Sequence, residues 1–228
     1  MFVDEKLSNF LIATAKGGVS LLPGGGLLAE YIGLAQSSIA DKRMNEWKDK
    51  VEQILSIIPK SMSELAESEE FYSCMQTATI GAMRAFQEEK RKYFANALYQ
   101  SAVNDTLDTD KKLFFLRLLD EYTLCHIKLL HYFSIDHFCS EDNVKKNGMV
   151  TITTVGETEY PIKGIIEFFP EYKNDEPFIR NIIKQLVADG LINAIEFDIP
   201  VSKERSRCKR ITLFGEELLD FIKQDNEE

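Results

Sequence analysis

Markers of catalysis, metal binding and secretion are scarce in this sequence. Its four cysteines are scattered and form no C-x-x-C pair, so neither a disulfide framework nor a zinc ribbon is indicated. It contains no Gly-Lys-Ser/Thr phosphate loop and no Gly-x-Ser-x-Gly elbow. Asp4 and Glu5 stand where a secretory signal needs basic residues before a long apolar run. We therefore expect a cytoplasmic protein that is not an enzyme, with no cofactor and no evident small-molecule substrate.

Histidine is also rare, and the spacing of the histidines does not suit a metal. The three are His126, His131 and His137. Two metal ligands on one helix need a step of three or four residues, whereas His126 and His131 are five apart and point to different sides. We predict no metal site and assign His126 a structural role near a helix end.

Positive charge is in deficit, yet one short segment is strongly basic. The 228 residues carry 27 Lys and Arg against 37 Asp and Glu, a formal charge of -10. This balance argues against a protein that coats nucleic acid or anionic lipid with its whole surface. Residues 203–210 hold five basic side chains against Glu204, a local charge of +4. Any contact with a polyanion is expected to be small and centred on this segment.

Long uninterrupted apolar runs are absent, and the stretch 17–40, which has the length of a membrane span, is broken by glycine. Its only charged residue is Glu30, and Pro23 precedes three glycines. Its hydropathy favours two helices joined by a glycine-rich turn. The small residues leave a second interpretation open, a helical hairpin that inserts into a membrane or binds a partner. The candidate contact residues of that hairpin are Gly24, Gly25, Gly26, Leu27 and Leu28.

Residues 1–138 have the pattern of a helical bundle, because apolar side chains recur at steps of three and four. The clearest stripe contains Met44, Trp47 and Val51, and a capping box at Ser61–Glu64 starts a new helix. That stripe lies on a helix expected at 41–58, and further helices are expected at 4–16, 27–39, 71–86, 87–103 and 109–134. The last is the longest and most of its positions are apolar, so we expect it to run through the centre of the bundle.

The pattern changes after residue 138. Residues 139–148 are polar and turn-forming, as in a linker. Residues 149–228 combine strand-like alternation at 149–155, 195–201 and 207–213 with helices at 161–169, 176–189 and 215–224, and with a charged loop at 202–206. The expected fold class is mainly α: an N-terminal helical bundle followed by a small C-terminal α+β domain at 149–228.

Two local patterns in the C-terminal domain carry a resemblance. One is L-x-x-x-G-L-I at the end of the helix 176–189, and the other is Arg210-Ile-Thr-Leu-Phe-Gly215-Glu-Glu-Leu-Leu219. Together with the order of elements, they resemble a winged helix-turn-helix domain over about 150–224. The resemblance makes 176–189 the recognition helix and 203–210 the wing. The candidate nucleic-acid-binding residues are Arg180, Asn181, Lys184 and Gln185 on the helix and Lys203, Arg205, Arg207, Lys209 and Arg210 on the wing. A wing that binds protein is the open alternative.

A second resemblance covers about 85–135. The stretches 93–102 and 113–130 combine a small-residue helix with a Phe- and Leu-rich helix. They are similar to uncharacterised bacterial helical proteins, including the abortive-infection family called Abi-alpha, although the long charged N-terminal helices usual in that family are missing. The resemblance implies a bacterial host and a role in phage defence.

Two hypotheses of function follow. The first is a non-enzymatic interaction or effector protein that acts through a protein partner, through its own oligomer, or at the inner membrane by way of residues 17–40. The second is a winged-helix DNA-binding transcriptional regulator with a helical oligomerisation domain.

Overall fold

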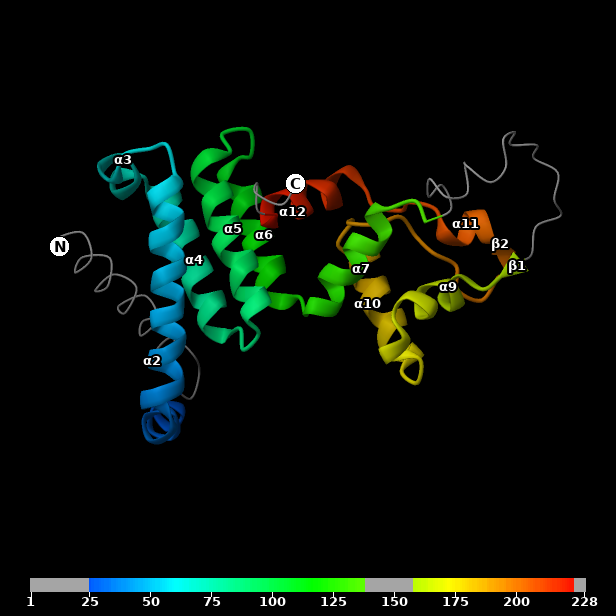
Figure 1. Cartoon of the computed structure of the whole chain (residues 1–228), viewed down its shortest axis with the longest axis horizontal. Helices are drawn as coiled ribbons and strands as arrows, with labels where there is room; N and C mark the ends of the chain where they lie inside the picture. The colour runs from blue at the N-terminus through cyan, green and yellow to red at the C-terminus, as the bar shows by residue number, and fades with distance from the viewer. Residues whose placement is uncertain (1–24, 138–157, 224–228) are drawn as a thin grey trace. The chain divides into compact units, whose positions relative to one another are not determined.

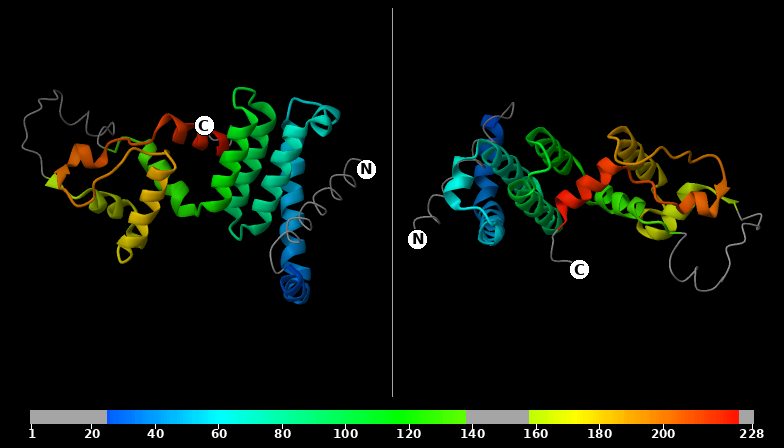
Figure 2. Two further views of the ribbon diagram at one scale, coloured as in Figure 1. Left: turned by 180° about the vertical axis from the view of Figure 1, so that it is seen from behind. Right: turned by 90° about the horizontal axis from the view of Figure 1, so that it is seen from above.

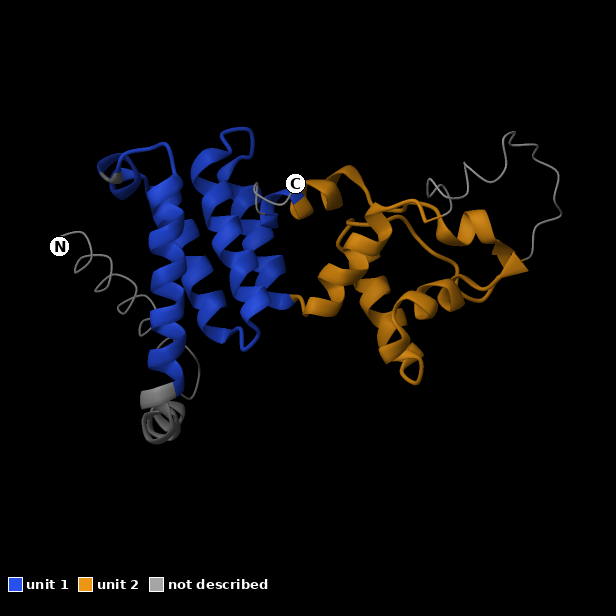
Figure 3. Ribbon diagram, viewed as in Figure 1, with its two compact units in different colours: residues 1–121, 220–228 blue, residues 122–219 orange. Residues whose placement is uncertain are grey.

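The computed structural model describes residues 25–137 and 158–223, apart from the side chains of residues 25–38 and of Met62. Its elements are mainly helices, together with one two-stranded sheet (Figure 1). The chain divides into two compact units, coloured separately in Figure 3. Unit 1 contains residues 1–121 and 220–228, and unit 2 contains residues 122–219. The expected linker 139–148 and strand 149–155 lie outside the described residues.

Unit 1 is a bundle of helices. Its helices are α2 (Gly25–Ile57), α3 (Met62–Glu67), α4 (Glu69–Arg84), α5 (Glu88–Val103) and α6 (Thr109–Glu121). Helix α4 contacts α2, α5 and α6, which the views of Figures 1 and 2 show side by side. The mainly helical character expected for this part of the chain is confirmed, but residues 122–134, which were expected to continue the bundle, lie in unit 2.

The core of unit 1 is built on the apolar stripe of α2. Trp47 and Val51 are completely buried, and the Trp47 indole N–H donates to Thr79 Oγ1 of α4 at 3.1 Å. Helices α4 and α5 approach closely at Gly81, where an added Cβ would lie 2.2 Å from Cζ of Phe94. Glycine at this position therefore allows the phenylalanine ring to lie against the backbone of α4.

Two helix boundaries differ from those expected. The segments 27–39 and 41–58 form one continuous helix, α2, because neither glycine nor proline separates them. The expected helix 109–134 is broken into α6 and α7 (Leu124–Ser134). At the break Thr123 is extended, and its N–H donates to Nδ1 of His126 at 3.1 Å. His126 thus occupies the third helical position of a capping box, where glutamate or glutamine is usual. The expectation of one long central helix is therefore wrong.

Unit 2 contains α7 and the elements that follow it. They are β1 (Thr158–Glu159), α9 (Pro161–Phe168), the 3₁₀ turn η1 (Pro170–Tyr172), α10 (Glu176–Ala188), β2 (Val201–Ser202), α11 (Lys203–Arg207) and α12 (Leu213–Ile222), whose last residues belong to unit 1. Strands β1 and β2 are antiparallel, with Thr158 opposite Ser202 and Glu159 opposite Val201. The expected helices near 161–169 and 176–189 are confirmed as α9 and α10.

The expected hairpin of long strands at 195–201 and 207–213 is not formed. In the segment 195–201 only the last residue, Val201, belongs to a strand, β2. The segment 207–213 contributes only Ile211, which forms an isolated bridge with Ile192. The expected charged loop is helix α11, because Ser202 caps it by accepting the N–H of Arg205 at 3.4 Å. Of the apolar residues that alternate in the first segment, Phe197 is buried beneath the guanidinium of Arg180, 4.8 Å from its ring centre, whereas Ile199 is 54% exposed.

Candidate functional site

Helix α10 is fixed by strong local signals. Asp175 caps it by accepting the N–H of Phe178, and Pro177 occupies its first turn. Its apolar side is completely or almost completely buried. The helix ends before Gly190, whose φ of 75° lies in the left-handed region that favours glycine. These features leave α10 with a single polar face.

The four recognition candidates on α10 divide into two pairs. Arg180 donates to Glu176 at 2.7 Å and forms an ion pair with Asp198 at 3.0 Å, and these acids raise its pKa. The Gln185 side-chain oxygen lies 3.0 Å from Nε2 of His126. Asn181, Lys184 and Gln185 are exposed, and Arg180 is half-buried. Two of the four, Arg180 and Gln185, are thus held by contacts within unit 2.

The basic segment 203–210 is engaged mainly with its own unit. Arg207 donates to Glu159 twice, at 2.9 and 3.0 Å, and to Glu167 at 2.7 Å. Lys209 pairs with Glu216. Arg210 donates to the backbone carbonyl of Arg205 at 2.6 Å. Lys203 is half-buried, and Arg205 is exposed. The local charge of +4 is thus largely neutralised by acids from β1, α9 and α12.

Burial and charge around Arg207 perturb its neighbours. The hydrogen bonds from Arg207 hold the pKa of Glu159 below its usual range and raise the pKa of Arg207 itself. Burial raises the pKa of Tyr132 to about 12. The hydroxyl of Tyr132 is buried without a hydrogen-bond partner among the described residues. The ring of Tyr132 stacks on His137, with centroids 4.3 Å apart, so this aromatic residue is fixed in place.

His126 belongs to a buried network at the start of α7. Because Nδ1 accepts the N–H of Thr123, the proton is assigned to Nε2, which then donates to Gln185. Its ring stacks on Tyr122 at 4.5 Å, and the Tyr122 hydroxyl donates to Asp189 at 2.6 Å. These contacts describe how His126 would fill the structural role predicted for it. Within the described ranges, no group of three or more His, Cys, Asp or Glu side chains could hold a metal ion.

Comparison with protein-family models, with curated proteins and with solved structures finds no match to this chain. The site therefore has to be interpreted from its own chemistry.

The glycine-rich candidates are only partly within the described structure. Gly24 lies outside it. Gly25 and Gly26 form the start of α2, and Leu27 and Leu28 follow in the same helix. No helix among the described residues is both long enough and apolar enough to cross a membrane.

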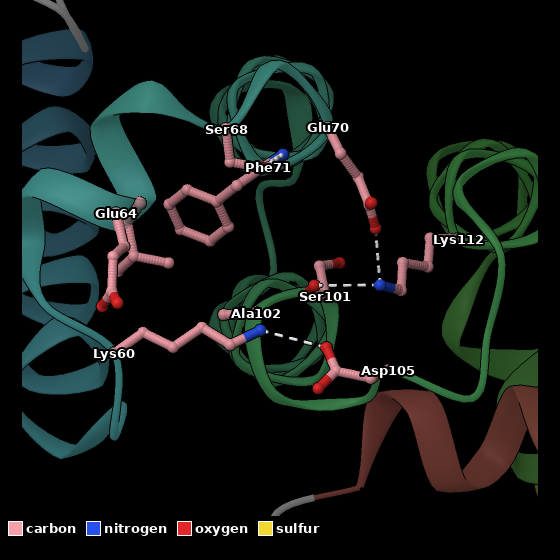
Figure 4. Close-up of a pocket in the computed structure, with 10 residues that line it drawn as sticks. Lys60, Glu64, Ser68, Glu70, Phe71, Ser101, Ala102, Asp105 and Lys112 are labelled. Carbon is pink, nitrogen blue, oxygen red and sulfur yellow. Dashed lines mark hydrogen bonds and ion pairs between the residues drawn. The ribbon is translucent and has the colours of Figure 1, made fainter.

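A cavity in unit 1 was not anticipated from the sequence. It has a volume of about 320 Å³ and lies between the link after α2, α3, the start of α4, the end of α5 and the start of α6 (Figure 4). Its charged lining residues are Lys60, Glu64, Glu70, Asp105 and Lys112. Their positions in the sequence give no common spacing, because five different segments contribute to the wall. Only the packing of α3 and α6 around α4 and α5 brings them together.

The deepest charge in this cavity is Lys112. Its side chain is 4% exposed, and its ammonium donates to Glu70 at 2.6 Å and to the carbonyl of Ser101 at 3.2 Å. The hydrogen bond from Lys112 lowers the pKa of Glu70. Burial raises the pKa of the nearby Cys74 thiol, which is therefore a poor nucleophile.

Proposed function

We propose that the protein is a non-enzymatic interaction protein of bacterial phage defence, and that unit 2 binds a protein partner. The defence role rests on the resemblance of residues 85–135 to the Abi-alpha proteins. The preference for a protein partner rests on one observation: Arg207, the central basic residue of segment 203–210, is held by Glu159 and Glu167. A phosphate would have to displace two carboxylates from this guanidinium.

The partner surface that we propose is the outer side of α9. Tyr160 at its N-cap is 41% exposed, and Phe168 at its last residue is 46% exposed. The Phe168 ring packs on Tyr132 and His137 at 5.0 and 4.5 Å, so its position is fixed before any partner arrives. Exposed aromatic side chains that are already ordered lose little entropy on binding, and aromatic residues dominate interface hot spots. We call Tyr160 and Phe168 the α9 aromatic pair.

The substitution Tyr160→Ser tests this proposal with little risk to folding. Tyr160 makes no side-chain capping bond, and serine is a favoured N-cap residue. The tagged full-length protein, purified from host cells after nuclease treatment, should retain a partner that Tyr160→Ser and Phe168→Ser both lose. The control is Tyr72→Ser, which removes another half-exposed tyrosine from unit 1.

The outcomes of that experiment are distinct. A partner that depends on both aromatic residues and persists in the control supports the proposal. Light scattering of the purified protein then shows whether the partner is a second copy of this chain. A set of co-purified proteins that is identical in all four samples contradicts it.

A specific observation also keeps the DNA-binding regulator as a second candidate. Helix α7, strand β1, helices α9 and α10, the Ile192–Ile211 bridge and α12 follow one another in the order of a winged helix-turn-helix domain. Two exposed basic residues lie in this part of the chain, Lys184 on α10 and Arg205 on α11. If DNA is bound, fluorescence anisotropy should show duplex binding that weakens steeply with salt and is reduced by Lys184→Ala and Arg205→Ala. Arg207→Ala is unsuitable as a test, because it would also remove the ion-pair partner of Glu159. No binding at low salt excludes this candidate.

A further inference from the structure

The cavity of unit 1 is partly open to solvent and has side chains of opposite charge in its wall. Two lysines and three acids line it, so its wall carries a formal charge of -1. In Figure 4 the ring of Phe71 lies between Glu64 on one side and Lys112 on the other. Phe71 and Leu65, which also lines the cavity, are 7% and 5% exposed. A ligand here would therefore meet an apolar surface flanked by separate positive and negative groups.

Lys112 uses two of its three hydrogen-bond donors on the described residues. An ammonium has three N–H donors, and the two contacts of Lys112 are to Glu70 and to the carbonyl of Ser101. An unmet donor on a side chain that is 4% exposed carries a desolvation cost, which an acceptor in the cavity would remove. The complementary ligand group is a carboxylate, because hydrogen bonds between two charged groups are the stronger kind.

Glu64 offers the opposite charge. Its Oε2 accepts the N–H of Ser61 at 2.7 Å in the capping box of α3, which leaves Oε1 for another donor. Glu70 is already paired with Lys112, and Asp105 is paired with Lys60 at 3.0 Å. Among the described residues, Glu64 is the lining carboxylate that makes no direct ion pair with a lysine, although the hydrogen bonds from Ser61 and, more weakly, the charge of Lys60 lower its pKa. It suits a ligand ammonium.

We propose that this cavity binds a small zwitterion of the free amino-acid type, with its carboxylate on Lys112, its ammonium at Glu64 and an apolar side chain against Phe71 and Leu65. A simple anion would meet a wall of net negative charge, and a simple cation would leave the spare donor of Lys112 unmet. A volume of about 320 Å³ lies at the small end of ligand pockets, which suits a ligand smaller than a nucleotide. This site is separate from the α9 aromatic pair.

Calorimetric titration of the full-length protein with L-leucine, L-methionine and L-phenylalanine tests the proposal. We expect at least one to bind at concentrations up to about 10 mM, where a ligand with a dissociation constant of about 1 mM would nearly saturate the site. For the amino acid that binds, the N-acetyl derivative lacks the ammonium and the amide lacks the carboxylate. Each derivative should bind about tenfold more weakly or worse, because each loses one charge-assisted contact.

The matched variants are Glu64→Gln and Glu67→Gln. Both side chains lie on α3 and are exposed, and both changes remove one negative charge, but only Glu64 lines the cavity. Glutamine preserves the capping box, so Glu64→Gln should fold and melt normally. It should weaken amino-acid binding about tenfold, whereas Glu67→Gln should leave it unchanged. The variant Ala102→Leu fills the cavity without touching an ion pair and should abolish binding.

Three results would overturn the proposal. The first is no binding by any of the three amino acids. The second is an N-acetyl or amide derivative that binds as tightly as its parent, which would show that one of the two charges is not recognised. The third is a Glu64→Gln protein with unchanged affinity.

Discussion

Arg207 holds Glu159 through two parallel hydrogen bonds, from Nε to Oε1 at 2.9 Å and from Nη2 to Oε2 at 3.0 Å. The same guanidinium donates to Glu167 at 2.7 Å, so one side chain of α11 ties together β1 and α9. Paired bonds of this kind fix direction as well as distance. Because the sheet of unit 2 has only two residues in each strand, we expect this cluster to stabilise the sheet as much as its backbone bonds do.

The pair predicts how stability depends on pH. The folded-state pKa of Glu159 lies below its ordinary value of 4.5, so the stabilisation is complete above that value and is lost as the pH falls through the folded pKa. Glu159→Gln should lower the free energy of unfolding by about 2 kcal/mol at neutral pH. The difference from the wild type should shrink as the pH falls well below 4.5. Urea unfolding followed by circular dichroism measures both, and a difference that is constant with pH would contradict this account.

Gly81→Ala should destabilise unit 1, although alanine usually favours a helix. An added Cβ would lie 2.2 Å from Cζ and 2.5 Å from Cε1 of Phe94, which is completely buried and cannot move away freely. We expect a loss of about 1–3 kcal/mol, as for other overpacked cores. In a double-mutant cycle, Phe94→Leu should reduce the cost of Gly81→Ala. Equal costs in both backgrounds would show that the helices do not meet at this glycine.

Gly190→Ala should cost about 1 kcal/mol for a different reason. Nothing lies within 4 Å of a Cβ added there, so packing is not affected, but the φ of 75° is strained for alanine. Gly190→Asn should cost less, because asparagine tolerates this conformation better. Thermal unfolding of the two variants provides the comparison, and the reverse order of stability would contradict it.

Leu119→Asp should unfold unit 1. Leu119 of α6 is 1% exposed, and an unpaired carboxylate at such a position costs several kcal/mol. The sole tryptophan, Trp47, is completely buried in the same unit, so its emission should shift to the red in this variant. Arg117→Ala changes an exposed residue of α6 and should leave the emission unchanged. A folded Leu119→Asp protein would contradict the burial of this side chain.

Helix positions were predictable from the sequence wherever local signals act alone. The capping box at Ser61 and Glu64 and the Asp175–Pro177 start of α10 both form as expected. Trp47 and Val51 are buried, as their spacing indicates. The break at Thr123 was missed because apolar residues continue on both sides of it. The competing force is a side-chain cap from His126, which a count of apolar positions does not register.

The candidate sites were less predictable, because they depend on distant pairs. The basic residues of 203–210 are obvious in the sequence, but Glu159 and Glu167, the acidic partners of Arg207, lie 48 and 40 positions away from it. The alternation at 195–201 predicts a strand, but only Phe197 of its apolar residues is buried, under Arg180, and Ile199 is exposed. The cavity around Lys112 could not be anticipated, because its lining is shared among five segments.

Unit 1 is completed by residues from both sides of unit 2. Asn96 of α5 donates to the carbonyl of Ile222 at 2.9 Å, and Phe115 of α6 meets Phe221 at a centroid distance of 5.6 Å. Unit 2 is therefore an insertion within the chain of unit 1. During synthesis on the ribosome, these contacts of the bundle form only after residues 221 and 222 have left the ribosome. We therefore expect unit 2 to be fully synthesised before unit 1 can finish folding.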